Sequence, residues 1–292
     1  MSLPILQLSH LYHYLKYLNS GLKRPNVKLD TGVLITSIDV DVGSKKLAIM
    51  NGGKNDAYVN DRLTEYQVAT IEELAIPLFV DLFEKLNLPV TFAIRGQLLE
   101  VGKDVLIPLL QTSVKHEIGS HGYSHRSFTY LSRDAAEIEL RMASSLMNRC
   151  GLSPKSFIFP RNKIAHLDML SQYGYKCYRG KAGFHHDGMY IRKHDQIYDV
   201  HPSLCLGKGI TPFFPMKMLD ICISKKLPMH VWLHLWSFGS ERSSIEKSIR
   251  KVLFPFFDYA RRKVEKGELS FETMSSAVMR LEAIPGQDFK YS

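Results

Sequence analysis

Strand-like and helix-like segments alternate along this 292-residue chain, and this order restricts the fold more than any other feature. Runs rich in β-branched and apolar residues predict strands at 33–42, 89–94, 156–159 and 230–235. Apolar residues at helical spacing predict helices at 64–87, 104–113, 166–173, 245–264 and 272–282, and a further helix capped by Ser132. Because parallel strands need long, usually helical crossovers, this order predicts an α/β fold with a largely parallel sheet.

The chain is expected to form one domain over residues 1–292, since no internal repeat and no linker divides it. Four leucines between residues 8 and 18 follow helical spacing. They predict a helix packed on the main domain, within an N-terminal extension of residues 1–30. An interfacial membrane helix is the alternative, which is disfavoured because Lys16 is its only basic residue.

Composition excludes several classes of protein. The chain has 38 Lys and Arg against 29 Asp and Glu, a net charge of +9. No nucleic-acid-binding motif accompanies this charge, so no nucleic acid is expected as a partner. Two explanations of the positive charge remain, a solvated surface or attraction to an anionic partner. No run of about 18 apolar residues predicts a transmembrane segment. The N-terminus lacks a signal-peptide pattern and the four cysteines show no zinc-finger spacing, so we expect a cytoplasmic protein with reduced thiols.

Asp39 and Asp41 lie at the carboxyl end of the first predicted strand, where parallel α/β folds gather their chemistry. Strand residues two positions apart share a face and are separated by about 7 Å. Two carboxylates on the inward face of an apolar strand are costly to bury without partners. The pair is therefore either a strand end that faces solvent or a metal ligand beside a general base.

His121 and His125 lie four positions apart in the segment HEIGSHGYSH. If this segment is helical, both imidazoles share one face and can bind one metal ion. His230 and His234 have the same spacing but lie in a predicted strand, where four residues span about 13 Å and cannot chelate one ion. His234 is the better active-site candidate because it lies later in that strand. A core or surface histidine is the alternative.

Asp41, His121 and His125 together form a set of two histidines and one carboxylate. Such a set suits Zn²⁺ or another divalent ion with open positions for water and substrate. The ion would lower the pKa of bound water and polarise a carbonyl group. Asp39 would then take the proton of the water, and His234 would protonate the leaving group.

Two further side chains are candidates for substrate contact. Arg161 follows the predicted strand 156–159 and would hold a carboxylate in place or bind an anionic substrate. An ordinary surface salt bridge is the alternative for this residue. Trp236 lies two residues beyond His234 and is either a stacking platform for a sugar or a core tryptophan.

These residues, in this order, resemble the polysaccharide deacetylase family, which is carbohydrate esterase family 4 with its NodB-homology domain. SIDVD is similar to the family's first motif, an aspartate pair that ends the first strand. EIGSHGYSH, residues 117–125, is similar to the second motif and is the most specific match. PVTFAI resembles the family's second strand, and KGELSFETM resembles its closing strand and turn. The resemblance covers about residues 33–280, which is the expected core.

The resemblance implies a distorted (β/α) barrel of about seven parallel strands with outer helices. It assigns the following site residues: Asp39 as catalytic base, His234 as catalytic histidine, and Asp41, His121 and His125 as metal ligands. The implied reaction is metal-dependent hydrolysis of an acetyl or similar small acyl group on a non-peptide nitrogen, usually of an N-acetylated sugar. The implied cofactor is one divalent ion, Zn²⁺ or alternatively Co²⁺, Mn²⁺ or Ni²⁺.

The sequence departs from the family motifs in ways that leave the substrate open. Val40 separates the two aspartates, which are adjacent in many members, and this form resembles the subgroup with amidases and deformylases. In the third motif Pro160 precedes Arg161, the reverse of the family's order, so the catalytic role of Arg161 rests on a rearranged motif. Asp199 is the candidate for the fourth motif.

We therefore expect a cytoplasmic deacetylase that acts on an acetylated sugar or a sugar-linked precursor of surface polysaccharide. The basic charge favours an anionic or lipid-linked substrate, with the inner membrane surface as a possible place of action. An amidase or deformylase with a non-sugar substrate is the first alternative, and a catalytically inactive carbohydrate-binding homologue is the second. The oligomeric state stays open, as does the question of whether loop 44–60 forms a lid.

Overall fold

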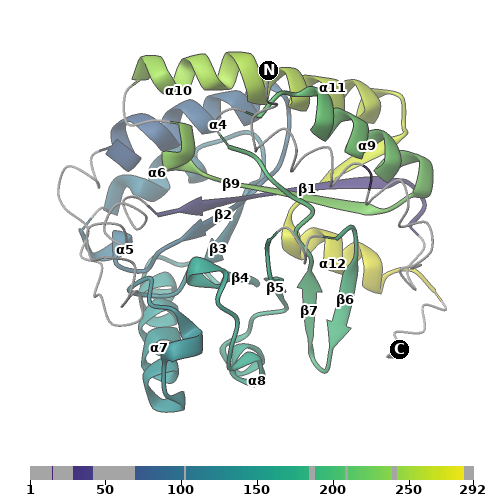
Figure 1. Cartoon of the computed structure of the whole chain (residues 1–292). Helices are drawn as coiled ribbons and strands as arrows, with labels where there is room; N and C mark the ends of the chain where they lie inside the picture. The colour runs from purple at the N-terminus through teal and green to yellow at the C-terminus, as the bar shows by residue number, and fades with distance from the viewer. Residues whose placement is uncertain are drawn as a thin grey trace, which may run out of the picture.

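The computed structural model describes residue 15 and residues 29–41, 70–101, 103–183, 188–207, 210–238 and 242–285. Its centre is a ten-stranded sheet with the order β6-β7-β5-β4-β3-β2-β1-β9-β8, in which β10 also pairs with β1 (Figure 1). The strands are β1 (Gly32–Val40), β2 (Thr91–Ile94), β3 (Glu117–Ser120), β4 (Ser156–Ile158), β5 (Cys177–Arg179), β6 (Ile191–His194), β7 (Ile197–Val200), β8 (Leu204–Cys205), β9 (Pro228–His234) and β10 (Leu269–Glu272). Every pairing in it is parallel except that of β6 with β7. The sheet curls into a half-barrel, so the expected α/β fold is confirmed.

β1 is the central strand, and all nine of its residues are buried. β9 pairs along one side of it. The other side is divided, because β10 pairs with Gly32–Ile35 and β2 pairs with Ser37–Val40. A parallel strand that is covered on both faces needs a nearly continuous apolar sequence, which is the signal that predicted it.

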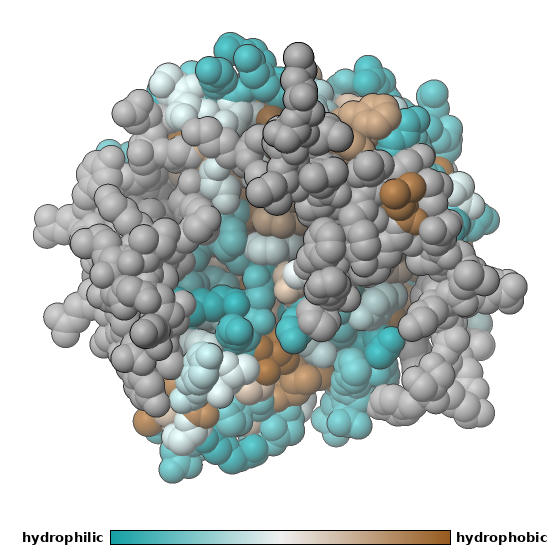
Figure 2. Space-filling model, in the orientation of Figure 1, coloured by the Kyte–Doolittle hydropathy of each residue, from teal (hydrophilic) through white to brown (hydrophobic). Residues whose placement is uncertain are grey.

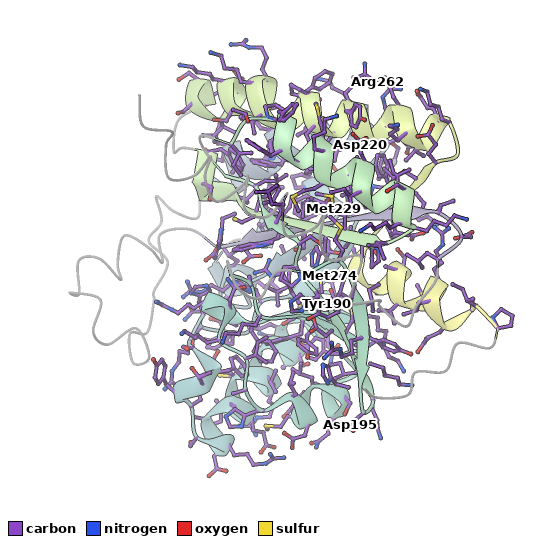
Figure 3. The ribbon with its side chains drawn as sticks, turned by 45° about the vertical axis from the view of Figure 1, so that its right-hand side comes forward. Tyr190, Asp195, Asp220, Met229, Arg262 and Met274 are labelled. Carbon is purple, nitrogen blue, oxygen red and sulfur yellow. The ribbon has the colours of Figure 1, made fainter. Side chains whose placement is uncertain are left out.

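Helices cover the two faces of the sheet differently (Figure 1). The α-helices are α4 (Ile76–Lys85), α5 (Leu98–Val101), α6 (Ile107–Leu110), α7 (Arg133–Arg149), α8 (Leu167–Leu170), α9 (Phe213–Lys225), α10 (Arg242–Ser248), α11 (Phe254–Glu265) and α12 (Met274–Glu282). α4, α9, α10 and α11 form the outer layer, whose exposed side is mostly hydrophilic (Figure 2). In the side view of Figure 3, Met229 of β9 lies between Asp220 of this layer and Met274 of α12. The sheet therefore has helices on both sides, with α12 inside its curl.

The N-terminus of α12 closes the amino end of the curl. Met274 N donates to Thr91 Oγ1 at 2.9 Å, and Ser275 N donates to Glu117 Oε2 at 3.0 Å. Thr91 begins β2 and Glu117 begins β3, so the first amides of the helix are held at the starts of these strands. Thr273 adds a capping box. The carboxyl ends of the strands are left for a functional site.

Several predicted helices are confirmed with changed bounds. The predicted helix 104–113 divides into a 3₁₀ turn (Lys103–Leu106) and α6. The predicted helix 245–264 is continued by a π-helical segment (Ile249–Leu253) between α10 and α11, and Pro255 stands in the first turn of α11. Ser132 caps α7 as predicted, and Gly174 ends the helix at 166–173 with φ 81°.

The sequence did not reveal α5, α9 or the short strands β3, β5, β6, β7 and β8. These strands have two to four residues, too few to show a period of two. Loop 44–60 and all of the predicted N-terminal helix except residue 15 lie outside the described residues. Among the helices that the structure describes, none combines the length and the apolar character needed to cross a bilayer.

His116, at the amino end of β3, gives the protein a pH-dependent stability. Its Nδ1 accepts a hydrogen bond from Val90 N at 3.3 Å, and its ring packs edge-on against Phe92. Burial lowers the pKa of His116 to about 4, so below pH 6.5 the unfolded chain binds more protons than the folded chain. The stabilisation is complete above pH 6.5 and is lost as the pH falls towards 4.

We expect His116→Gln to reduce the loss of unfolding free energy between pH 7 and pH 5 by up to about 1 kcal/mol per pH unit, allowing for partial exposure. Urea unfolding at each pH measures this difference. His194→Gln in β6 is the matched control and should retain the wild-type pH dependence. A His116 variant with the wild-type slope would contradict the prediction.

Candidate active site

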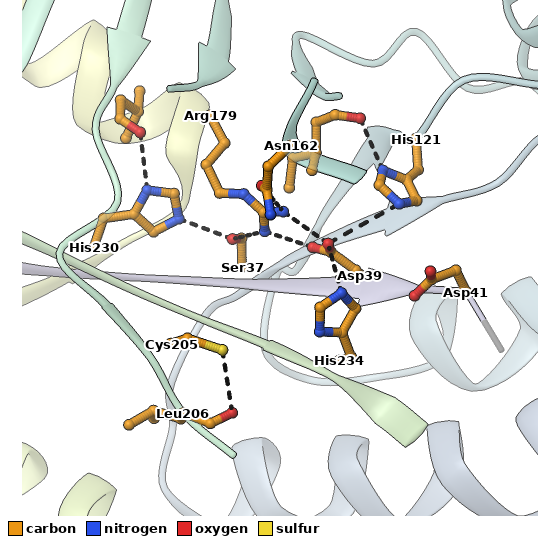
Figure 4. A network of polar contacts seen from close by, with 12 residues as sticks. Ser37, Asp39, Asp41, His121, Asn162, Arg179, Cys205, Leu206, His230 and His234 are labelled. Atoms are coloured by element: carbon orange, nitrogen blue, oxygen red, sulfur yellow. Dashed lines mark hydrogen bonds and ion pairs between the residues drawn. The ribbon is translucent and has the colours of Figure 1, made fainter. Parts of the chain in front are cut away.

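The polar groups of the site come from the carboxyl ends of neighbouring strands (Figure 4). β1 ends beside Asp39 and Asp41, His121 follows β3, Arg179 ends β5, and His234 ends β9. Parallel strands bring their carboxyl ends to one edge of a sheet, where α/β proteins bind their ligands. The pairing register puts Asp39 directly opposite His234.

Asp41, His121 and His125 meet in a buried cluster. One possible ligand atom from each residue lies within 4.8 Å of the others. His125 Nε2 is 3.0 Å from Asp41 Oδ2, and the two imidazole rings have centroids 4.9 Å apart. Bonds from zinc to nitrogen or oxygen are about 2.0–2.2 Å long, so small side-chain rotations would bring all three atoms onto one ion.

The hydrogen bonding of His121 fits a metal ligand. Its Nδ1 lies 2.8 Å from the carbonyl oxygen of Ile158, which can only accept, so Nδ1 carries the proton. The lone pair is then on Nε2, which is buried and has no hydrogen-bond partner among the described residues. A backbone carbonyl that fixes the tautomer in this way is typical of metal-binding histidines. The donor set therefore fits a divalent ion.

The assumption that His121 and His125 lie on a helix is wrong. β3 ends at Ser120, and both histidines stand in the loop that follows it. Gly122 has φ 69° and His125 has φ 64°, so the loop contains two left-handed residues and no helical turn. The two imidazoles meet because the loop folds back on itself, and not because of helical spacing.

A buried arginine, Arg179, holds Asp39. Arg179 Nη1 donates to Asp39 Oδ1 at 2.5 Å, and Nη2 donates to Oδ2 at 2.7 Å. Nη2 also donates to Asn162 Oδ1 at 3.1 Å, and the guanidinium lies 4.3 Å from the centre of the Trp232 ring. A two-pronged pair of this kind fixes both the position and the orientation of the carboxylate.

Ser37 and His230 form a second set of polar contacts, which reaches Arg179 through the serine hydroxyl. Arg179 Nη1 lies 3.4 Å from Ser37 Oγ, which lies 2.8 Å from His230 Nε2. His230 Nδ1 donates to the carbonyl of Val200 at 3.0 Å, so Nε2 accepts from the serine hydroxyl. Burial lowers the pKa of His230 to about 3 and keeps this histidine neutral beside the arginine. His230 thus belongs to the hydrogen-bond network that holds Arg179 and, through it, Asp39.

The protonation states in the site suit a metal ion. Burial alone would raise the pKa of Asp39, but the charge and hydrogen bonds of Arg179 together with the two nearby histidines outweigh it and leave the pKa below its ordinary value. Burial acts on Asp41 in the same way, and the hydrogen bond from His125 together with the charges of the nearby histidines outweighs it, so the pKa of Asp41 is well below its ordinary value. Burial lowers the pKa of His121 to about 4. At neutral pH the carboxylates are ionised and His121 is neutral, as metal binding requires.

His234 lies beside Asp39 at the open side of the site. Its Nε2 is 3.4 Å from Asp39 Oδ2, and its side chain is 19% exposed against 3% for Asp39. Its ring packs against Trp232 with centroids 5.2 Å apart. His234 is therefore the more accessible of the two groups that can transfer protons.

The structure places the other expected residues less centrally. Arg161 follows β4 in a 3₁₀ turn with φ 59° and is half-buried, but the guanidinium that binds Asp39 is that of Arg179. Trp236 lies in a 3₁₀ turn after β9, and its side chain is outside the described part of the chain. Asp199 pairs with His201 at 2.9 Å on β7.

Arg179 is a candidate functional residue that the sequence did not reveal. The available signal was an arginine directly before Gly180, in a segment that also contains Lys176 and Lys181. Gly180 is required there, because a Cβ at this position would lie 2.1 Å from Asp199 Oδ1. An arginine among lysines reads as ordinary charged surface, so this signal alone had little weight.

We expect Arg179→Lys to lower kcat by about 10- to 100-fold with little change in bound metal. Lysine keeps the charge but has a single ammonium group, so it cannot hold both oxygens of Asp39. Steady-state kinetics on any accepted substrate would measure the effect. Arg192→Lys, at an exposed position of β6, is the control and should leave kcat unchanged. Equal rates for wild type and Arg179→Lys would contradict a role of the two-pronged contact.

Comparison with known sequences gives one family. The sequence profile described as polysaccharide deacetylase matches residues 71–178, which include His121 and His125 but end before Arg179. The curated "Peptidoglycan deacetylase" of Helicobacter pylori (strain ATCC 700392 / 26695) is 24% identical over 107 residues. That match spans 36% of this chain and 36% of the relative. The profile match thus covers the segment with the two histidines.

Comparison with solved structures supports the fold over nearly the whole chain. A Mycobacterium smegmatis protein assigned as a polysaccharide deacetylase has a TM-score of 0.65 at 16% identity, covering 89% of this chain and 95% of its own. Puue allantoinase has a TM-score of 0.63 at 13% identity, covering 92% and 97%. The Bc1960 peptidoglycan N-acetylglucosamine deacetylase has a TM-score of 0.52 at 14% identity, covering 86% and 89%. At these identities the structural matches bear on the fold alone.

Proposed function

Since the sequence match and the curled parallel sheet support a polysaccharide deacetylase of the NodB type, we propose that this chain removes an acetyl or similar small acyl group from the nitrogen of a sugar. We further propose that the reaction depends on one divalent ion. Zn²⁺ is the proposed ion, with Co²⁺, Mn²⁺ or Ni²⁺ as alternatives, because two imidazoles and one carboxylate suit these metals.

One observation carries the proposal: an ionised, buried carboxylate lies beside the three possible ligands without belonging to them. Asp39 Oδ2 is 4.0 Å from His121 Nε2 and 3.4 Å from His234 Nε2. A purely structural ion pair of Asp39 with Arg179 would not need two histidines next to it. A general base must lie next to the place where the attacking water is held, and the position of Asp39 beside the three possible ligands supports this role.

The proposed division of labour follows from these positions. The ligand residues are Asp41, His121 and His125, and the ion they hold would activate water and polarise the acyl carbonyl. Asp39 takes a proton from the attacking water, and Arg179 keeps Asp39 ionised and oriented.

His234 is proposed as the general acid. As the carbon–nitrogen bond breaks, its electron pair stays with the nitrogen. His234 gives a proton to this nitrogen, and the product leaves as an amine. Its partial exposure allows it to reach a bound substrate. Arg161 is proposed to bind an anionic part of the substrate, and Trp236 to stack on a sugar ring.

The proposed substrate is an N-acetylated sugar or a sugar-linked precursor in surface-polysaccharide metabolism. The net charge of +9 supports an anionic or lipid-linked form. Within the described part of the chain the four cysteines form no disulfide, which supports a reducing, cytoplasmic setting. We propose that the protein acts there, at or near the inner membrane surface.

Acetate release tests the proposed function. The purified protein is stripped with a chelator, reloaded with Zn²⁺ or Co²⁺, and incubated with N-acetylated amino sugars, their oligomers and their nucleotide-linked forms. We expect acetate release only from the reloaded protein. A protein that carries one ion per chain but releases no acetate from any amino sugar would overturn the sugar part of the proposal.

An amidase with a non-sugar substrate is the second candidate. Val40 separates the two aspartates, and the fold matches Puue allantoinase over 92% of this chain. Small linear and cyclic amides belong in the same assay. Turnover of these amides with inert acetylated sugars would favour the second candidate over the first.

A further inference from the structure

We propose that Glu139 of α7 is the positioning residue for the loop that carries both histidine ligands. The proposal rests on the proposed function, because it concerns residues 121–125 as a metal-binding loop. Glu139 touches neither the substrate nor the ion in this scheme. It acts on His125 through the two residues that precede it.

Both carboxylate oxygens of Glu139 accept hydrogen bonds from this loop. Its Oε2 accepts from Tyr123 N at 3.2 Å and from Ser124 N at 2.9 Å, while its Oε1 accepts from Ser124 Oγ. Glu139 is 3% exposed. A buried carboxylate is costly unless donors surround it, and here all three donors come from one loop.

The other side of the loop is held by backbone hydrogen bonds to the chain after β2, and the Tyr123 hydroxyl also donates to Glu100 Oε2 at 3.1 Å. His121 N donates to Ile94 O at 2.9 Å, and the next two carbonyls, those of Gly122 and Tyr123, accept from Gly96 N at 2.8 Å and Gln97 N at 3.1 Å. The chain after β2 thus fixes the start of the loop. The amides of Tyr123 and Ser124 point the other way, to Glu139.

Glu139 consequently determines where His125 lies. His125 follows Ser124 directly and has φ 64°, a conformation that is rare outside glycine and needs support from its surroundings. α7 provides a rigid base, because Ala136, Leu140 and Ala143 next to Glu139 are fully buried. Packing at this position would be satisfied by an apolar side chain, whereas the loop needs an acceptor with two oxygens.

Metal affinity of variants tests the proposal. Glu139→Ala removes all three acceptor contacts, and Glu139→Asp keeps the charge but shortens the reach by one methylene. Affinity for Zn²⁺ and Co²⁺ is measured by competition with a chelator, together with the Co²⁺ absorption spectrum and thermal unfolding. Glu137→Ala and Glu137→Asp, at an exposed position of the same helix, are the matched controls.

We expect Glu139→Ala to weaken metal binding by about 10- to 100-fold, as substitutions behind metal ligands commonly do. Glu139→Asp should weaken it less and alter the Co²⁺ spectrum, while the Glu137 controls match wild type. A folded Glu139→Ala protein with wild-type affinity and spectrum would overturn the proposal. If Glu139→Ala does not fold, Glu139→Asp decides by the same two readouts. Failure of the wild type to bind any ion would instead refute the proposed function.

Discussion

Replacing His121 with alanine is expected to remove the bound ion and to lower the rate of deacetylation by at least about 10³-fold. The variant loses a neutral imidazole whose Nε2 is buried and has no other hydrogen-bond partner among the described residues. Metal ions contribute several kcal/mol to such reactions, and each 1.4 kcal/mol corresponds to a tenfold change in rate. Elemental analysis of wild type and variant, followed by acetate release, measures both effects.

His194→Ala is the control for the His121 variant, since His194 is a half-buried histidine of β6 away from the cluster. It should retain about one ion per chain. Retention of the ion by His121→Ala would remove this residue from the ligand set. A wild type that takes up no ion after incubation with Zn²⁺ would favour the catalytically inactive carbohydrate-binding homologue.

Asp39→Asn should lower kcat by about 10²- to 10⁴-fold while the metal content stays at the wild-type value. The amide has nearly the same shape but cannot take a proton, and general-base catalysis commonly contributes a factor of this size. The ligand residues are unchanged in the variant. A variant with wild-type kcat would exclude Asp39 as the base and favour the homologue without catalysis.

The same substitution also leaves the charge of Arg179 buried without its carboxylate, which is expected to cost about 3–5 kcal/mol of stability. The double variant Asp39→Asn with Arg179→Met separates the two effects. Replacing both charges in a buried pair is often nearly neutral for stability. We expect the double variant to regain most of the thermal stability and none of the activity. Recovery of activity with stability would mean that Asp39 is only structural.

The proposed ligand set could be predicted from sequence because its signals are local. The segment 117–125 places two histidines four positions apart, and SIDVD places two aspartates at the end of an apolar strand. A strand that is buried on both faces must be apolar, so the carboxylates at its end stand out against it. The α/β class followed from the order of segments, which depends only on the period of apolar residues.

Tertiary structure alone decided which basic group completes the site. Arg179 is 140 positions from Asp39 in the sequence, and the two meet only because β5 and β1 belong to one curled sheet. The same is true of Glu139, which lies on a helix with no motif of its own and reaches the loop by packing. A residue whose partner lies far away in the sequence leaves no periodic or local signal, because their contact depends on the order of the strands in the sheet.

The sequence by itself determined the fold class of this protein, through the order of its apolar segments. It also revealed the two aspartates and the two histidines, because each pair lies within one short segment. The tertiary structure decided the conformation of the histidine loop, the partner of Asp39 and the place of α12 inside the sheet. The physical reason is the range of the interactions involved. Burial and capping act within a few residues, whereas a buried ion pair forms only where the complete sheet brings its two charges together.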